Sequence, residues 1–156
     1  MKTASIVDIK KELTHKSYEE LADLCLRLSK FKKENKELLT YLLFESHDED
    51  GYIQSVKNYI DEEFATINTT SYFYIKKSVR KILRNIKKYT RYSLKKETEV
   101  ELLIYFCEIL KDFKPSIKHN VTLMNIYERQ LVLAKKIIAT LHEDLQYDFN
   151  LKLDGL

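Results

Sequence analysis

The chain has 156 residues, enough for one domain whose hydrophobic core needs neither a metal nor disulfide bonds. Apolar residues make up 44% and charged residues 33%, which is typical of a folded domain and excludes a disordered chain. With two glycines and one proline, the sequence lacks the turn residues of a β-rich fold and the glycine-rich loops that bind phosphate. We therefore expect an all-α protein.

The organisation expected along the chain is a single helical domain over residues 1–149, followed by a flexible C-terminal tail at 150–156. About six helices would form either an irregular antiparallel bundle or a short, solenoid-like stack of helical hairpins. An internal similarity between residues 21–45 and 103–127, at an offset of 82, favours the second arrangement.

The N-terminal half contains clear helix signals. A short helix is expected after Ser5, and Ser17 with Glu20 has the spacing of a capping box that begins a second helix. A leucine-rich third helix follows, then the polar loop "SHDEDG", in which Asp50 is the expected cap of a fourth helix. The stretch "NTTS" then separates this helix from a basic helix over residues 72–92.

The C-terminal half begins with a second capping box, formed by Thr98 and Glu101, and a helix that reaches about Phe113. This helix is apolar nearly all round, which is typical of an element buried on most sides. We expect its side chains at the centre of the core, in particular Leu103, Phe106 and Leu110.

The last expected helix spans residues 121–146. Its apolar residues alternate in steps of three and four, as in a coiled-coil seam, and a second apolar stripe flanks that seam. Because one neighbouring helix rarely covers two stripes, we expect a homodimer through this helix.

Catalytic and cofactor signals are missing from the sequence. Cys25 and Cys107 each lie in an apolar segment and not in a C-x-x-C pair, so both are expected to be buried, reduced thiols. The four histidines include no pair at metal-binding spacing, and the acidic loop that resembles a calcium site has Lys57 where a glutamate ligand is required. We expect no cofactor, no metal and no enzymatic activity.

The location expected from the sequence is the cytoplasm. The N-terminus shows neither the apolar core nor the cleavage site of a signal peptide, and no apolar run reaches the roughly 20 residues that span a bilayer. We therefore expect no insertion into membranes.

The most unusual feature is the basic helix. Between residues 74 and 96 the chain has ten of its 27 Lys and Arg residues and no Asp or Glu, whereas the remainder has 17 basic against 24 acidic residues. The helical spacing places an apolar stripe on one face and the cations on the other. The candidate binding residues are Lys77, Arg80, Lys81, Arg84, Lys87, Lys88 and Arg91.

Neighbouring cations on a helix repel each other, so this face predicts a compensating negative charge. We interpret the protein as an interaction module whose basic helix binds an acidic protein partner. The alternative is sequence-independent binding of RNA or DNA through the same residues, and a third possibility is a helical enzyme without recognisable motifs. Alternatively, the basic face is compensated within the chain, if the acidic segments 61–63 or 97–101 lie across from it.

Overall fold

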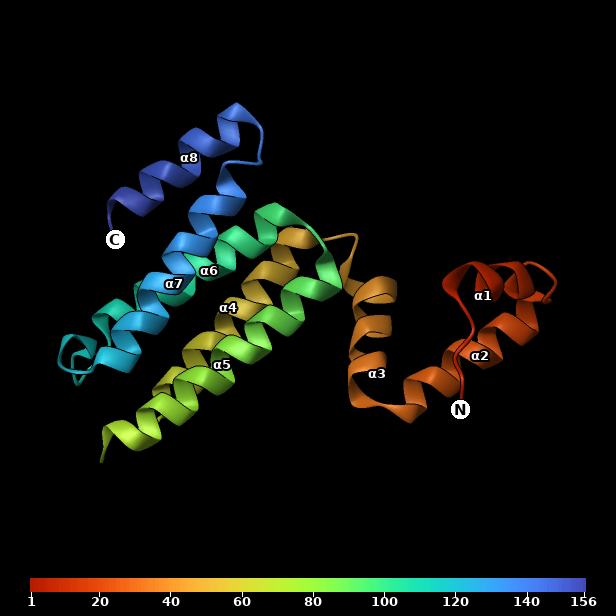
Figure 1. Cartoon of the computed structure of the whole chain (residues 1–156), viewed down its shortest axis with the longest axis horizontal. Coiled ribbons are helices and arrows are strands. Elements are labelled where there is room, and N and C mark those ends of the chain that lie inside the picture. Colours follow the sequence, from red (N-terminus) through yellow and green to blue (C-terminus); the bar gives the residue numbers. More distant parts are fainter. The chain divides into compact units, whose positions relative to one another are not determined.

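The computed structural model describes all 156 residues and contains eight α-helices and no strands (Figure 1). The all-α prediction is confirmed, and the expected count of about six helices is too low. The helices are α1 (Ile6–Leu13), α2 (Tyr18–Phe31), α3 (Lys33–Thr40), α4 (Glu49–Ala65), α5 (Tyr72–Ser93), α6 (Lys96–Asp112), α7 (Val121–Ile138) and α8 (Glu143–Asp154). A π-helical turn at Tyr41–Glu45 and a 3₁₀ turn at Ile117–His119 complete the secondary structure.

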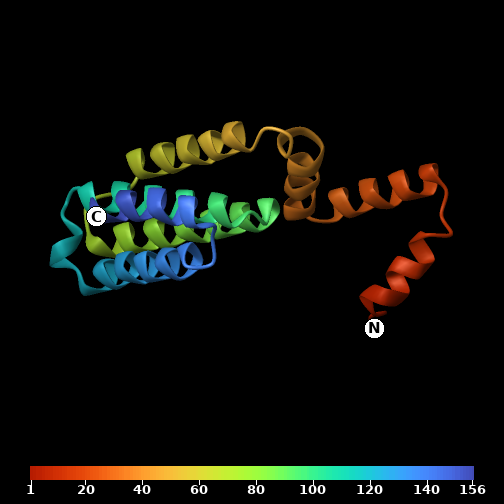
Figure 2. The same cartoon turned by 90° about the horizontal axis from the view of Figure 1, so that it is seen from above.

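The chain forms two compact units, residues 1–44 and 45–156, where the sequence predicted a single domain over 1–149. The first unit contains α1 to α3, and the second contains α4 to α8. Within the second unit successive helices run in alternating directions (Figures 1 and 2). No helix in the chain is both long enough and apolar enough to cross a membrane.

Helix α6 is the centre of the second unit, as its apolar sequence predicted. It packs against α4, α5, α7 and α8. Leu103, Phe106 and Leu110 are completely buried, and eight of the 17 residues of α6 lie in the core. The central placement of this helix is therefore confirmed.

The start of α6 differs from the predicted capping box. The helix begins at Lys96, two residues before Thr98, and the Thr98 hydroxyl donates a hydrogen bond to Glu49 at 2.6 Å. Glu49 also accepts a hydrogen bond from Ser93 and forms an ion pair with Lys95 at 3.2 Å. One carboxylate thus joins the beginning of α4 to the α5–α6 connection, which is a tertiary role that local spacing does not reveal.

The last predicted helix is two helices. Helix α7 ends at Ile138, and α8 begins after His142, whose side chain caps the Asp144 amide. The residues expected to be a flexible tail complete α8, because Leu153 is buried against the core. The chain reverses direction here, so that α8 packs on α6 and α7.

The two apolar stripes expected to form a dimer are occupied within the chain. Five residues of α7 are buried, and residues of the flanking stripe pack against the core formed with α6 and α8. Covering these stripes therefore requires no second chain, and the homodimer through residues 121–146 stays a prediction.

The two cysteines differ in their surroundings. Cys107 is buried in α6, and burial, with a contribution from Glu108, raises the pKa of its thiol to about 12. Cys25 is exposed on α2, which corrects the prediction that both thiols are buried. The apolar stripe around Cys25 indicated a covered face, but none of the residues of α1, α2 or α3 is buried.

A second carboxylate network is centred on the half-buried Glu101. Its carboxylate accepts hydrogen bonds from Lys57 of α4 at 2.6 Å and from Lys152 of α8 at 2.5 Å. Burial opposes ionisation of Glu101, but the two lysines outweigh it, so the pKa of this carboxyl lies below its ordinary value. Glu101, expected to cap α6, instead links α6 to both neighbouring helices.

Replacing Leu103 with alanine tests the central role of α6. We expect Leu103→Ala to lower the free energy of unfolding by about 2–5 kcal/mol, because it leaves a cavity in a tightly packed core. Leu151→Ala is the control, since Leu151 of α8 is 56% exposed and should change stability by less than about 0.5 kcal/mol. Urea unfolding of both variants measures the difference, and equal losses would contradict the assignment.

Replacing Glu101 with glutamine tests the carboxylate network through its pH dependence. Because the folded pKa of Glu101 is lowered, its contribution is fully present above pH 4.5, the ordinary value, and is lost as the pH falls through the folded pKa. Glu101→Gln should therefore lower stability by about 1–3 kcal/mol at neutral pH, and this difference should shrink in acid. A difference that stays constant down to pH 3 would show that ionisation of Glu101 contributes nothing.

Candidate interaction groove

Helix α5 presents the basic face because its apolar face is fully used in the core. Ile75, Val79, Ile82 and Ile86 are completely buried, at the i, i+4, i+7, i+11 spacing of one helical stripe. This stripe contacts α4 and α6. The rotation of α5 is therefore fixed, and its remaining surface must face the solvent.

The seven predicted binding residues separate into two lines on α5. The first, called here the cation stripe, has the 4, 3, 4 spacing of a single helical row and consists of Arg80, Arg84, Lys87 and Arg91. The second line lies about a quarter turn away and consists of Lys77, Lys81 and Lys88. The structure gives the two lines different surroundings.

Two members of the second line have partners inside the chain. The Lys81 ammonium lies 2.9 Å from the Glu63 carboxylate of α4, and the hydrogen bond to Glu63 raises the pKa of Lys81. Lys88 lies over the Tyr89 ring at 5.0 Å from its centroid. The charge of Lys81 is therefore compensated within the chain, because the acidic segment 61–63 supplies Glu63.

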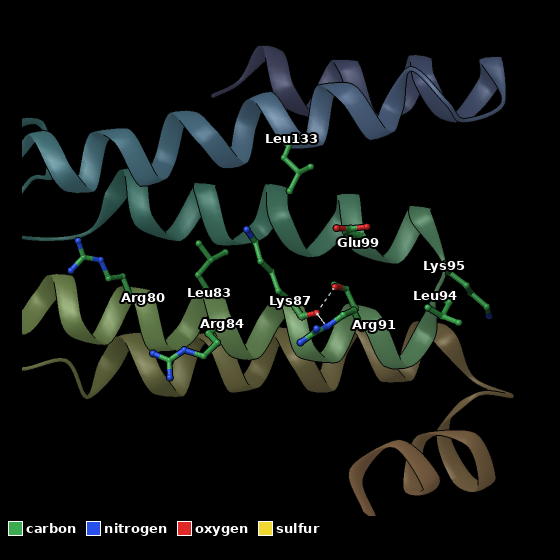
Figure 3. Close-up of a pocket in the computed structure, with 10 residues that line it drawn as sticks. Arg80, Leu83, Arg84, Lys87, Arg91, Leu94, Lys95, Glu99 and Leu133 are labelled. Atoms are coloured by element: carbon green, nitrogen blue, oxygen red, sulfur yellow. Dashed lines mark hydrogen bonds between the residues drawn. The ribbon is translucent and has the colours of Figure 1, made fainter. Parts of the chain in front are cut away.

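The cation stripe lines a groove of about 640 Å³ (Figure 3). The other lining residues come from α5, α6, α7 and the α5–α6 connection, and no sequence pattern predicted them. These are Leu83, Thr90, Leu94, Lys95, Glu99 and Leu133. We call this feature the basic groove.

The floor of the basic groove is apolar. Leu83 of α5 and Leu133 of α7 are half-buried and pack against the core. In Figure 3 their side chains point toward each other, from opposite sides of α6. The groove therefore combines a leucine floor with cationic walls, and no tyrosine or phenylalanine lines it.

The charge of the cation stripe is not neutralised within the chain. None of its four residues has a carboxylate oxygen within the 4.0 Å of an ion pair. The Arg91 Nε donates a hydrogen bond to the Lys87 carbonyl oxygen at 3.3 Å, which holds the Arg91 guanidinium along the stripe. The three successive like-charge pairs along the stripe cost about 0.5–1.5 kcal/mol together at low salt.

Leu94 stands at the end of the groove in an unusual conformation. It ends α5 with a φ of 59°, in the left-handed region, and its side chain is 83% exposed. Glycine is the usual residue at such a position because a side chain is strained there. Neither the backbone nor the core explains why a leucine is present.

Part of the groove is predictable from the spacing of the cations along α5. The 4, 3, 4 row of the cation stripe is visible in the sequence and separates it from the line that contains Lys81. The contributions of Leu133 and Glu99 are not visible, because they depend on how α6 and α7 pack against α5. Comparison of the chain with protein-family models, with curated proteins and with solved structures finds no match.

Replacing Leu94 with glycine tests the backbone strain. Leu94→Gly should raise the free energy of unfolding by about 0.5–1 kcal/mol, because glycine adopts the left-handed region without the steric cost that a Cβ introduces. The matched control is Val132→Gly at an exposed position within α7, where glycine should destabilise by about 1 kcal/mol. Thermal and urea unfolding give the sign, and a loss of stability in Leu94→Gly would contradict the strain argument.

Proposed function

We propose that this chain is a non-enzymatic interaction module and that the basic groove binds an acidic, amphipathic segment of a protein partner. The observation that carries the proposal is the combination of four unneutralised cations with a leucine floor. Either element alone is an ordinary surface feature, but together they match a ligand that has carboxylates beside apolar side chains.

The spacing of the cation stripe favours a helical ligand. Its four residues extend over about 16 Å along α5, at the 1.5 Å rise of a helix. An acidic helix that lies along α5 presents carboxylates at the same i, i+4, i+7, i+11 spacing and places an adjacent apolar row over the leucine floor. The exposed Leu94 extends this apolar surface at the end of the groove.

The composition of the groove favours a protein over a nucleic acid. Lys and Arg bind phosphate as well as they bind carboxylate, but a phosphate backbone makes no apolar contact with a leucine floor. Single-stranded nucleic acids bind through bases stacked on aromatic rings, and none of the 11 tyrosines in the chain lines the groove.

The proposal is tested with a synthetic helical peptide that carries glutamates at i, i+4, i+7 and i+11 and leucines beside them. The triple variant Arg80→Glu, Arg84→Glu, Lys87→Glu should bind it at least about tenfold more weakly, since each exposed pair contributes up to about 1 kcal/mol. The variant should remain folded and keep or slightly raise its stability, because the substitutions relieve repulsion. Fluorescence anisotropy and urea unfolding measure the two effects.

A charge-matched control separates the groove from net charge. Lys114→Glu, Lys118→Glu, Lys135→Glu changes the net charge equally at exposed positions outside the groove and should bind the peptide nearly as well as the natural sequence. Equal weakening of both triple variants would mean that only overall charge matters. Tighter binding of a DNA duplex or single-stranded RNA than of the peptide at physiological salt, with a steep salt dependence, would replace this proposal with nucleic-acid binding.

A further inference from the structure

Glu99 is the only acidic residue that lines the basic groove. It lies in the first turn of α6 and is half-buried, and Figure 3 shows it toward the Leu94 end of the groove. No cationic nitrogen lies within the 4.0 Å of an ion pair from its carboxylate, and its side chain makes no hydrogen bond. A half-buried carboxylate without a partner favours a cation that the ligand supplies.

The cations at this end of the groove are held away from Glu99. The Lys95 ammonium pairs with the Glu49 carboxylate at 3.2 Å. The hydrogen bond from Arg91 Nε to the Lys87 carbonyl oxygen turns the Arg91 guanidinium back along α5, toward the middle of the groove (Figure 3). Neither neighbour therefore neutralises Glu99.

The charge of the groove changes along its length as a result. Toward the Arg80 end the cation stripe has no internal partner, whereas at the other end Glu49 neutralises Lys95 and Glu99 adds a negative charge. The 4, 3, 4 spacing of the stripe reads the same in both directions, so the stripe alone accepts a partner helix in either direction. Glu99 removes this symmetry.

The ends of the flanking helices favour one direction. Helix α5 ends at Ser93, and α7 ends at Ile138, close to the start of α6, where Lys96 donates a hydrogen bond to Thr140 at 3.1 Å. Two helix C-termini with partial negative charge therefore lie at the Leu94 end, against the single N-terminus of α6. A partner helix that runs antiparallel to α5 places its partly positive N-terminus at this end.

We propose that Glu99 pairs with a Lys or Arg side chain of the partner and that the partner helix binds antiparallel to α5. The cation then precedes the carboxylates in the partner sequence by about one helical turn, because Glu99 lies level with the last turn of α5 and the Arg91 guanidinium lies further back. This charge order is the reverse of the one that stabilises an isolated helix. The inference rests on the function proposed for the basic groove and adds what the partner must contain.

The first test uses three peptides that share the four glutamates and the leucines of the peptide described above. One has a lysine a turn before the first glutamate, the second has it a turn after the last, and the third has alanine at both positions. Fluorescence anisotropy should show that the first binds about three- to fivefold more tightly than the third, the range of a partly exposed ion pair.

The second peptide controls for net charge and helicity. It reaches Glu99 only by binding parallel to α5, so it should bind more weakly than the first. A lysine near the C-terminus stabilises the free helix, whereas one near the N-terminus does not. A preference for the first peptide therefore has no origin in helicity.

The second test changes Glu99 itself. Glu99→Gln should abolish the advantage of the first peptide over the third, and Glu99→Lys should reverse it. Glu97→Gln is the matched control, since Glu97 lies in the same first turn of α6 but does not line the groove, and it should keep the advantage. Urea unfolding of both glutamine variants measures the effect on α6 that the two carboxylates share. An advantage that persists in Glu99→Gln overturns the inference.

The third test measures the direction of the bound helix. A nitroxide at the N-terminus of the first peptide should broaden the backbone amide NMR signals of Leu94 and Lys95 more than that of Arg80. Stronger broadening at Arg80, or equal binding of the first and third peptides, overturns this inference. The proposed function survives that result if Arg80→Glu, Arg84→Glu, Lys87→Glu still weakens binding of the third peptide. If none of the three peptides binds, both are wrong.

Discussion

The burial of α6 on most of its sides is the constraint on which the second unit depends. A helix with so narrow a polar face must be covered on its other sides, so α4, α5, α7 and α8 have to contribute apolar faces to it. Helix α5 supplies its isoleucine and valine row, and this fixes which of its sides faces the solvent. The exposure of the cation stripe is thus a consequence of core packing, and the basic groove exists because α5 and α7 cover neighbouring sides of the same buried helix.

The first unit has no helix of this kind, and its side chains are arranged differently as a result. Each of α1, α2 and α3 is amphipathic, but none of them contributes a buried residue. Leucines that would belong to a core in a larger unit remain on its surface. The free energy available from covering them is therefore still available to an intermolecular contact.

Much of the fold could be predicted from the sequence because helices are encoded locally. The Ser17 cap, the extent of α5 and the central position of α6 follow from side-chain chemistry and the 3.6-residue period. The pairing of charges could not be predicted in the same way. Glu63 and Lys81 are 18 residues apart, and Glu101 joins lysines from two other helices, so their contacts depend on tertiary packing.

The prediction for Cys25 failed for a related reason. An apolar stripe shows which face of a helix favours burial, but it does not show whether a neighbour in the same chain covers that face. In α6 such neighbours exist, whereas in α2 they do not.

The two exposed surfaces, the leucines of α2 and the cation stripe, also differ in how they favour association. Exposed cations are well hydrated, and each ion pair that they form contributes at most about 1 kcal/mol, whereas covering a leucine that is about half-exposed contributes on the order of 1 kcal/mol. The two kinds of contact are therefore similar in strength per residue, and they differ in specificity, because ion pairs depend on the spacing of the charges.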